Sequence, residues 1–249
     1  MESDTTIEPL SLTDKLNRET RAIHARTHHL IALKLVAALT DPRIYRQPLR
    51  DFYFLFRIIE EEWRTRMKTC AVLKEAYIED LMNRRKAFER DLRAYYGRGW
   101  KDVKITPRML DYTNHVRYIG AYSPELLLAY GFTMYGALIS GGQTIRSKVL
   151  ARKLFPSNGT NIFVFQDAQG AEIDTKVLRQ QLHDKFNRLE LSEEVRERLV
   201  EEAKEIFRRN IEVVEDISGV EYSVARWVLL AVLLVVLLRL GWKAVGYVL

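Results

Sequence analysis

The segment that most constrains this chain is Leu126–Ile145, LLLAYGFTMYGALISGGQTI, which has no charged residue although 29% of the chain is charged. Ser123-Pro124-Glu125 precedes it and is typical of a helix start, with serine as N-cap and proline in the first turn. Glycine costs about 1 kcal/mol against alanine inside a helix. The segment nevertheless contains four of the twelve glycines: Gly131, Gly136, Gly141 and Gly142. We therefore expect a kinked helix, or one whose backbone another group approaches closely.

Three interpretations of this segment stand at this point. Its length is sufficient for a transmembrane span, but Gln143, Ser140 and Thr133 make it less apolar than most spans. A central helix buried in a helical bundle fits the pattern better. In the third interpretation the glycines let a flat ligand lie against the helix backbone, and the rest of the chain has to decide among the three.

Size and charge limit the class of protein. A chain of 249 residues that is 47% hydrophobic can bury one core of about 200 residues and carry a tail. The net charge of +6 favours acidic partners, but the two signs alternate along most of the chain, which is typical of solvated helix faces. With no zinc-ligand spacing and no basic aromatic module, nucleic-acid binding is not expected. Cys70 is the only cysteine, so no intramolecular disulfide is expected.

Helical periodicity dominates the chain and predicts an all-α bundle. Residues 1–10 are expected to be disordered and residues 11–220 to form the helical domain. A capping box is expected at Ser11 and Asp14, and a short β-like run at Phe163–Phe165. Helices are predicted from Ser11 to the turn at Asp41-Pro42, and then over Pro48–Tyr77, Leu81–Tyr96, Arg108–Tyr118, Pro124–Leu154, Ile173–Arg188 and Ser192–Ile217.

The C-terminal segment, residues 222–249, is predicted to be a membrane anchor. Trp227–Leu238 reads WVLLAVLLVVLL and spans about 18 Å as a helix, and Trp227–Leu249 spans about 34 Å, against a hydrocarbon core of ~30 Å. Arg239 and Lys243 would then extend to the far interface. A buried core helix is the alternative, because short apolar runs are ambiguous.

Five histidines are the candidate metal ligands, and His24 lies at the edge of the buried face of the first helix. His24 and His28 are four residues apart and share a helix face, but no third ligand at helical spacing supports a zinc or di-iron site. His24 could simply be a core residue. A single imidazole that faces a glycine-rich helix across a cavity is, however, one way of holding haem.

Three segments together resemble the haem oxygenase family, over most of residues 12–217. Glu19–His24, ETRAIH, is similar to the family's proximal helix, and Ser123–Gln143, with SPELLLAY and ISGGQ, is similar to its distal helix. Leu189–Ile217 is similar to its last helix, and a C-terminal anchor is a feature of its animal microsomal members. The resemblance implies the multi-helical haem oxygenase bundle.

The resemblance also implies which residues bind haem. His24 would be the axial ligand of the iron, and Ser140, Gly141 and Gly142 would line the catalytic side together with Thr133 and Ala137. Basic side chains would pair with the haem propionates, and a phenylalanine would lie at the haem edge. The matching positions are Arg21, Arg179, His183 and Phe207.

The chain departs from the family pattern where the family's chemistry takes place. Leu138 occupies the position of the catalytic aspartate, which anchors a water network that delivers protons during haem cleavage. Ala137 replaces the glycine against the haem, and Met134 replaces an arginine. On the proximal side, His28 replaces a glutamate that makes the axial imidazole more electron-rich.

Two functional hypotheses follow. The first is a tail-anchored haem oxygenase that uses O₂ to open haem to biliverdin, iron and carbon monoxide. Its electrons would come from NADPH through a membrane cytochrome reductase. The second is a haem-binding sensor, carrier or peroxidase-like protein that has lost ring opening because of Leu138. A helical bundle without haem is a third reading. The anchor, residues 224–249, would place the domain on the cytosolic face of the endoplasmic reticulum, with the outer mitochondrial membrane as the alternative.

Overall fold

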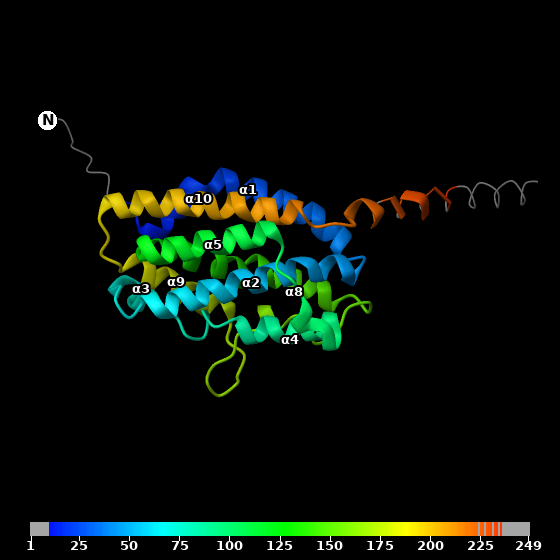
Figure 1. The fold of residues 1–249 in the computed structure, drawn as a ribbon, viewed down its shortest axis with the longest axis horizontal. Helices are drawn as coiled ribbons and strands as arrows, with labels where there is room; N and C mark the ends of the chain where they lie inside the picture. The colour runs from blue at the N-terminus through cyan, green and yellow to red at the C-terminus, as the bar shows by residue number, and fades with distance from the viewer. Residues whose placement is uncertain (1–9, 224, 227, 231, 234, 236–249) are drawn as a thin grey trace, which may run out of the picture.

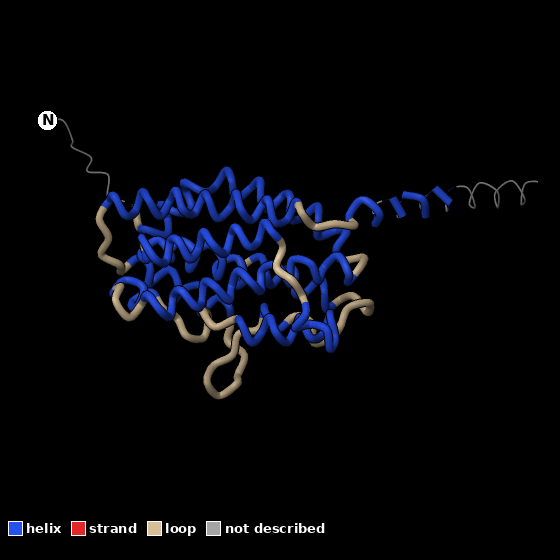
Figure 2. Tube along the Cα trace, in the orientation of Figure 1, coloured by secondary structure: helices blue, strands red, loops and turns tan. Residues whose placement is uncertain are grey.

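Helices account for nearly all regular structure in the described part of this chain, as the sequence predicts (Figure 2). The computed structural model describes residues 10–223, 225–226, 228–230, 232–233 and 235. α1 (Leu12–Ala38) and α10 (Glu193–Glu215) lie side by side along one edge of the bundle (Figure 1). α5 (Pro107–Tyr122) packs between α10 and α2 (Pro42–Arg66). The all-α fold class is therefore confirmed for the described residues.

The start of α1 is fixed by the predicted capping interaction. Ser11 Oγ accepts a hydrogen bond from the backbone N–H of Asp14 at 3.2 Å and donates one to its carboxylate at 2.6 Å. Side-chain acceptors of this kind satisfy amide groups that the first helical turn leaves unpaired. Leu12 and Leu16, which follow this cap four residues apart, are almost completely buried.

The predicted boundaries of the second helix are wrong at both ends. Asp41 caps α2 by accepting a hydrogen bond from the backbone N–H of Arg43 at 2.8 Å, so the helix begins at Pro42 and runs through Pro48. It ends at Arg66, and the separate short helix α3 (Ala71–Ala76) follows after a turn. The Asp41 cap and Pro42 in the first turn start the helix. Pro48 lies near this start, so it does not end the helix.

Helix α5 continues through Gly120 to Tyr122, whereas the sequence predicts that this helix ends at Tyr118, before the glycine. A Cβ atom at Gly120 would overlap the carboxylate of Glu62 on α2. The glycine therefore marks a close approach of two helices and not a helix end.

The segment before α9 (Thr175–Asn187) is held by a buried carboxylate on α4 (Arg85–Tyr96). Asp91 accepts hydrogen bonds from the backbone N–H groups of Asn161 and Ile162 at 2.8 and 2.9 Å, and its burial raises the pKa of the carboxyl group. These bonds fix η4 (Asn161–Phe163), a single 3₁₀ turn. The β-like run predicted at Phe163–Phe165 is not a strand. An isolated bridge between Gln166 and Glu172 lies nearby.

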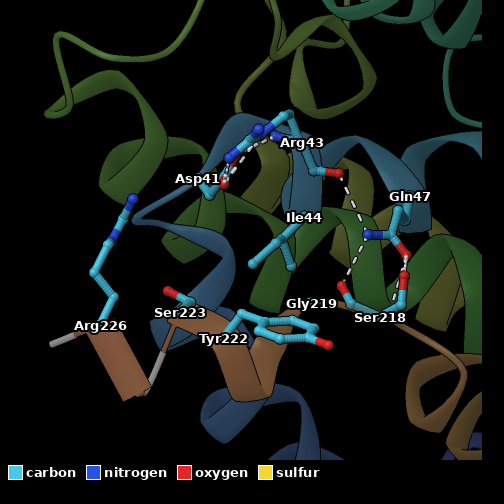
Figure 3. Close-up of a pocket in the computed structure, with 9 residues that line it drawn as sticks. All are labelled: Asp41, Arg43, Ile44, Gln47, Ser218, Gly219, Tyr222, Ser223 and Arg226. Carbon is cyan, nitrogen blue, oxygen red and sulfur yellow. Dashed lines mark hydrogen bonds and ion pairs between the residues drawn. The ribbon is translucent and has the colours of Figure 1, made fainter. Parts of the chain in front are cut away.

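The chain after α10 leaves the bundle beside the corner between α1 and α2 (Figure 3). Gln47 Nε2 donates to the carbonyl of Ser218 at 3.0 Å, and the Thr40 and Ser223 hydroxyls are 2.6 Å apart. The described residues beyond this point are helical, and their apolar side chains are about half exposed.

Among the described residues, no helix has both the length and the apolar character needed to cross a membrane. Much of the predicted anchor lies outside these residues, since positions 224, 227, 231, 234 and 236–249 are not among them. The predicted disorder of residues 1–10 falls almost wholly outside them as well, because the description begins at Leu10.

Candidate functional site

The distal segment identified from the sequence is a broken helix with two irregular points. It begins with η2 (Pro124–Leu126) and α6 (Leu127–Tyr130), and continues with the π-helical turn η3 (Gly131–Tyr135). α7 (Gly136–Ile139) then ends at Ser140, whose backbone angles of φ −110° and ψ −89° separate it from α8 (Gly141–Leu150). A π turn inserts an extra residue into the helix and is frequent at functional sites. The predicted kink therefore exists, and it has two parts.

The glycines of this segment occur where they do for different structural reasons. A Cβ atom at Gly131 would lie 2.6 Å from the indole ring of Trp63, and one at Gly142 would lie 2.6 Å from the ring of Phe163. These two glycines make room for aromatic side chains of the protein itself. At Gly141, in contrast, an added Cβ would meet nothing within 4 Å. Only Gly141 combines missing side-chain bulk with open space next to the kink.

The open side of the kink is formed by small side chains. Ala137, Ser140 and Gly141 are all exposed, whereas Thr133 in the π turn is partly buried. An exposed patch of small residues beside a helix break lets a planar molecule approach the backbone closely. The sequence predicts these four residues as ligand contacts, and the structure brings three of them to one surface. Their role in binding or catalysis stays a prediction.

His24 is exposed on α1, and its ring lies close to the rings of Phe207 and His28. The ring of Phe207 on α10 lies perpendicular to the His24 ring at a centroid distance of 5.6 Å. The ring of His28, one turn along α1, lies 6.5 Å away at an angle of 24°. The structure therefore brings His24 and Phe207 together, as the sequence comparison with the family implies.

Helix α9 places the other predicted basic residues beside the distal helix. Arg179 Nη2 donates to the carbonyl of Ile139 at 3.4 Å, directly before the break at Ser140. The His183 ring lies 5.8 Å from the ring of Phe132 in the π turn. Helices α9 and α10 each contact both α1 and the distal segment. They therefore hold α1, the proximal wall of the candidate site, and the distal segment, its distal wall, in place relative to each other.

The residues present fit a flat, anionic ligand with a central metal. His24 offers an exposed imidazole, and the patch around Gly141 offers open space. Arg21 and Arg179 are exposed, and neither forms an ion pair with another described residue. Guanidinium groups that form no internal ion pair are available for carboxylates of a ligand. Haem has this combination of features.

Leu138 faces the interior and carries no polar group. Its side chain is 8% exposed and belongs to the hydrophobic core. The sulfur of Met134, one turn earlier, accepts a hydrogen bond from Asn210 Nδ2 at 3.4 Å. The two positions at which the family carries an aspartate and an arginine are thus integrated into the packing of this protein.

A buried polar network lies behind the distal segment, and sequence reasoning missed it. Tyr112 donates to Asn210 Oδ1 at 3.3 Å, and Tyr130 donates to Glu202 Oε1 at 2.8 Å. His115 Nε2 lies 3.0 Å from the same Glu202 oxygen. Burial is the main cause that raises the pKa of both tyrosines, so their hydroxyl groups stay protonated donors. The sequence offers only a weak signal for this network, namely the polar residues Tyr112, Tyr130 and Asn210 within helical segments.

Comparisons with known proteins identify the family to which this bundle belongs. The family described as "Heme oxygenase" matches residues 10–216. Heme oxygenase 1 from Homo sapiens is 30% identical over 215 residues, which cover 84% of this chain and 73% of that protein. Heme oxygenase 1 from Synechocystis sp. is 28% identical over 212 residues, which cover 84% and 86%.

A solved structure gives the same result. The crystal structure of heme oxygenase-1 from Synechocystis sp. PCC6803 in complex with heme matches with a TM-score of 0.77 and 26% identity, and covers 90% of this chain and all of that one. The chain therefore belongs to the haem oxygenase family. Its bundle is the all-α haem oxygenase fold.

Proposed function

We propose that this protein binds haem with His24 as the axial iron ligand and cleaves it to biliverdin, iron and carbon monoxide. Membership of the family supports haem binding and haem-degrading enzyme activity. The axial histidine and the products are the finer parts of the proposal. The observation that carries them is an exposed His24 in contact with Phe207, in a bundle whose distal helix breaks at an open Gly141.

The side chains around the site would position the ligand. Arg21 and Arg179 would pair with the two propionates, because a guanidinium group matches a carboxylate in charge and geometry. His183 lies one turn from Arg179 and would add a further donor. Phe207 would pack against the edge of the macrocycle and limit the rotation of the His24 ring.

The distal wall would exclude bulk water and leave the backbone accessible. Ala137, Ser140 and Gly141 present little side-chain bulk, and Thr133 lies beside them. Gly142, which the sequence also predicts in the lining, is instead buried against Phe163. Bound haem supplies the iron at which dioxygen is activated. The protein contributes the orientation of the macrocycle and the protons that ring opening consumes.

The supply of protons distinguishes the two candidate functions. Leu138 cannot hold a water molecule by a hydrogen bond, and it lies in the hydrophobic core. This observation favours the second candidate, a haem-binding sensor, carrier or peroxidase-like protein of the same fold without efficient ring opening. The first candidate remains our proposal because the fold and the family sequence pattern extend over most of the chain.

Electron supply and location are further parts of the proposal. The electrons would come from NADPH through a cytochrome reductase whose acidic face suits the net charge of +6. Residues 224–249 would anchor the protein to a membrane, with the helical domain on the cytosolic face of the endoplasmic reticulum. The outer mitochondrial membrane is the alternative location, since basic residues lie within and after the apolar run.

A hemin titration of the detergent-solubilised full chain tests the proposal. We expect a Soret band that saturates at one hemin per chain and that needs a higher hemin concentration to saturate in His24→Ala, because the axial imidazole is removed. A matched control is His115→Ala, which removes a histidine that contacts Glu202 and does not belong to the predicted site. If hemin produces no saturable band with the wild-type chain, both haem-binding candidates are wrong.

A further inference from the structure

We propose that His28 is a second iron-ligand position, so that this protein can hold haem in two positions one helical turn apart. The inference rests on the proposed haem-binding function. It depends on a residue that distinguishes this chain from the family pattern, because the resemblance implies a glutamate at the position of His28. A carboxylate there would support the axial histidine, whereas an imidazole can replace it as a ligand.

The geometry of α1 places the two imidazoles on one side of the helix. His24 and His28 are both exposed, and their rings are nearly parallel, at an angle of 24° and a centroid distance of 6.5 Å. Four residues of helix advance about 6 Å along the axis and turn by about 40°. Both rings therefore project from the same face of α1, and neither is hydrogen-bonded to another described residue.

The surface next to His28 can also accept a macrocycle. Ile31 and Leu35 continue the same face of α1 and are partly buried against the core. An iron bound at His28 would place the macrocycle over these apolar side chains, while iron at His24 would place it beside Phe207. Contact with these apolar side chains would stabilise the macrocycle at His28.

The nearby charged groups would allow the same shift. Arg21 precedes His24 by three residues, is exposed and lies on the same side of the helix. A flexible arginine side chain can follow a carboxylate over several ångströms. The propionates would keep a cationic partner when the iron moves by one turn.

His29 offers a matched control. It is exposed and adjacent in sequence to His28, but it lies about 140° around the helix from His24. It therefore faces away from the proposed site. A variant at His29 changes the histidine content in the same way and leaves the two ligand positions intact.

The experiment compares full-length proteins that carry no polyhistidine tag and that are purified without imidazole. The wild type, His24→Ala, His28→Ala, His24→Ala with His28→Ala, and His24→Ala with His29→Ala are titrated with hemin. The ferrous forms are then examined by resonance Raman spectroscopy for an iron–histidine stretching band. Circular dichroism establishes that each variant is folded, which is expected because all three side chains are exposed.

We expect His24→Ala to keep an iron–histidine band, with a dissociation constant for hemin raised by about tenfold, the order typical of altered ligand support. The His24/His29 variant should behave in the same way, and the His24/His28 variant should lose the band. In the wild type, two iron–histidine bands should collapse to one in His28→Ala.

Three results would overturn the inference. If His24→Ala loses the band while the wild type has it, His24 is the sole ligand, and the proposed function stands without the second position. If the His24/His28 variant keeps the band, another residue supplies the ligand. If the wild type binds no hemin, the proposed function and this inference fail together.

Discussion

Replacing Gly131 by alanine tests whether the distal segment is held in its irregular form by packing against the core. Gly131 is the first residue of the π turn, and its added Cβ would lie 2.6 and 2.8 Å from two ring carbons of Trp63. It would also lie 3.1 Å from a ring carbon of Phe186. All three distances are well below normal carbon–carbon contact, so the neighbouring side chains or the helix must move.

The magnitude follows from how firmly Trp63 is held. Its side chain is 2% exposed, and its Nε1 donates to the carbonyl of Leu73 at 3.0 Å, so the ring cannot move without loss of a buried hydrogen bond. Overpacking a core usually costs about 1–3 kcal/mol, and a fixed aromatic ring places this site in the upper half of that range. Alanine recovers at most about 1 kcal/mol of helix propensity. We expect a net loss of about 1–2 kcal/mol, or a melting temperature lower by roughly 2–8 °C.

The assay is chemical and thermal denaturation of the full chain, with Gly141→Ala as the matched control. An alanine at Gly141 meets nothing within 4 Å, so its stability should equal or slightly exceed that of the wild type. Its methyl group would, however, enter the proposed haem site, so hemin affinity should fall in this variant and not in folded Gly131→Ala. Equal stability of Gly131→Ala and the wild type would refute the packing argument.

Three further predictions concern the distal wall, the propionates and a buried carboxyl group. Leu138→Asp should raise the initial rate of biliverdin formation by at least ~tenfold, because a carboxylate can hold the water that delivers protons; an unchanged rate would mean that protons arrive by another route. Arg179→Gln should raise the dissociation constant for hemin about two- to fivefold, as expected for an exposed ion pair, whereas Arg152→Gln, also exposed, should leave it unchanged. Burial raises the pKa of Glu60 above its ordinary 4.5, so the unfolded chain releases this proton first as the pH rises. Urea titrations should therefore show the wild type losing unfolding free energy relative to Glu60→Gln between pH 4 and 7; a gain would reverse the assigned sign.

The fold class could be predicted because periodicity and capping are local properties. Ser11 caps α1 and Ser192 caps α10 as their sequence positions suggest. The errors arise where a tertiary contact decides. Gly120 resembles a helix end in the sequence, but it is the point at which α5 meets Glu62 of α2. Such a contact has no signature within the segment itself.

The parts of the candidate site that could be predicted are those that depend on residue types and spacing within one segment. The break of the distal helix follows from its glycines, and the pairing of His24 with Phe207 follows from the resemblance to the family. The separate roles of Gly131 and Gly142 do not, because they depend on Trp63 and Phe163, which are distant in sequence.

The buried network around Glu202 could not be predicted either. It joins Tyr130 and His115 from two other helices to one carboxylate. Each of these residues alone looks like an ordinary member of an amphipathic helix. Only the packing of α10 against α5 and α6 brings them within hydrogen-bonding distance.

The most direct test of the central claim is the absorbance spectrum of the hemin-loaded full chain after addition of NADPH and a cytochrome reductase under air. We expect the Soret band to bleach while the broad band of biliverdin appears in equal molar amount, with carbon monoxide released. A Soret band that persists under these conditions, or that bleaches without biliverdin, would contradict the claim that this protein opens haem and would favour a haem-binding role.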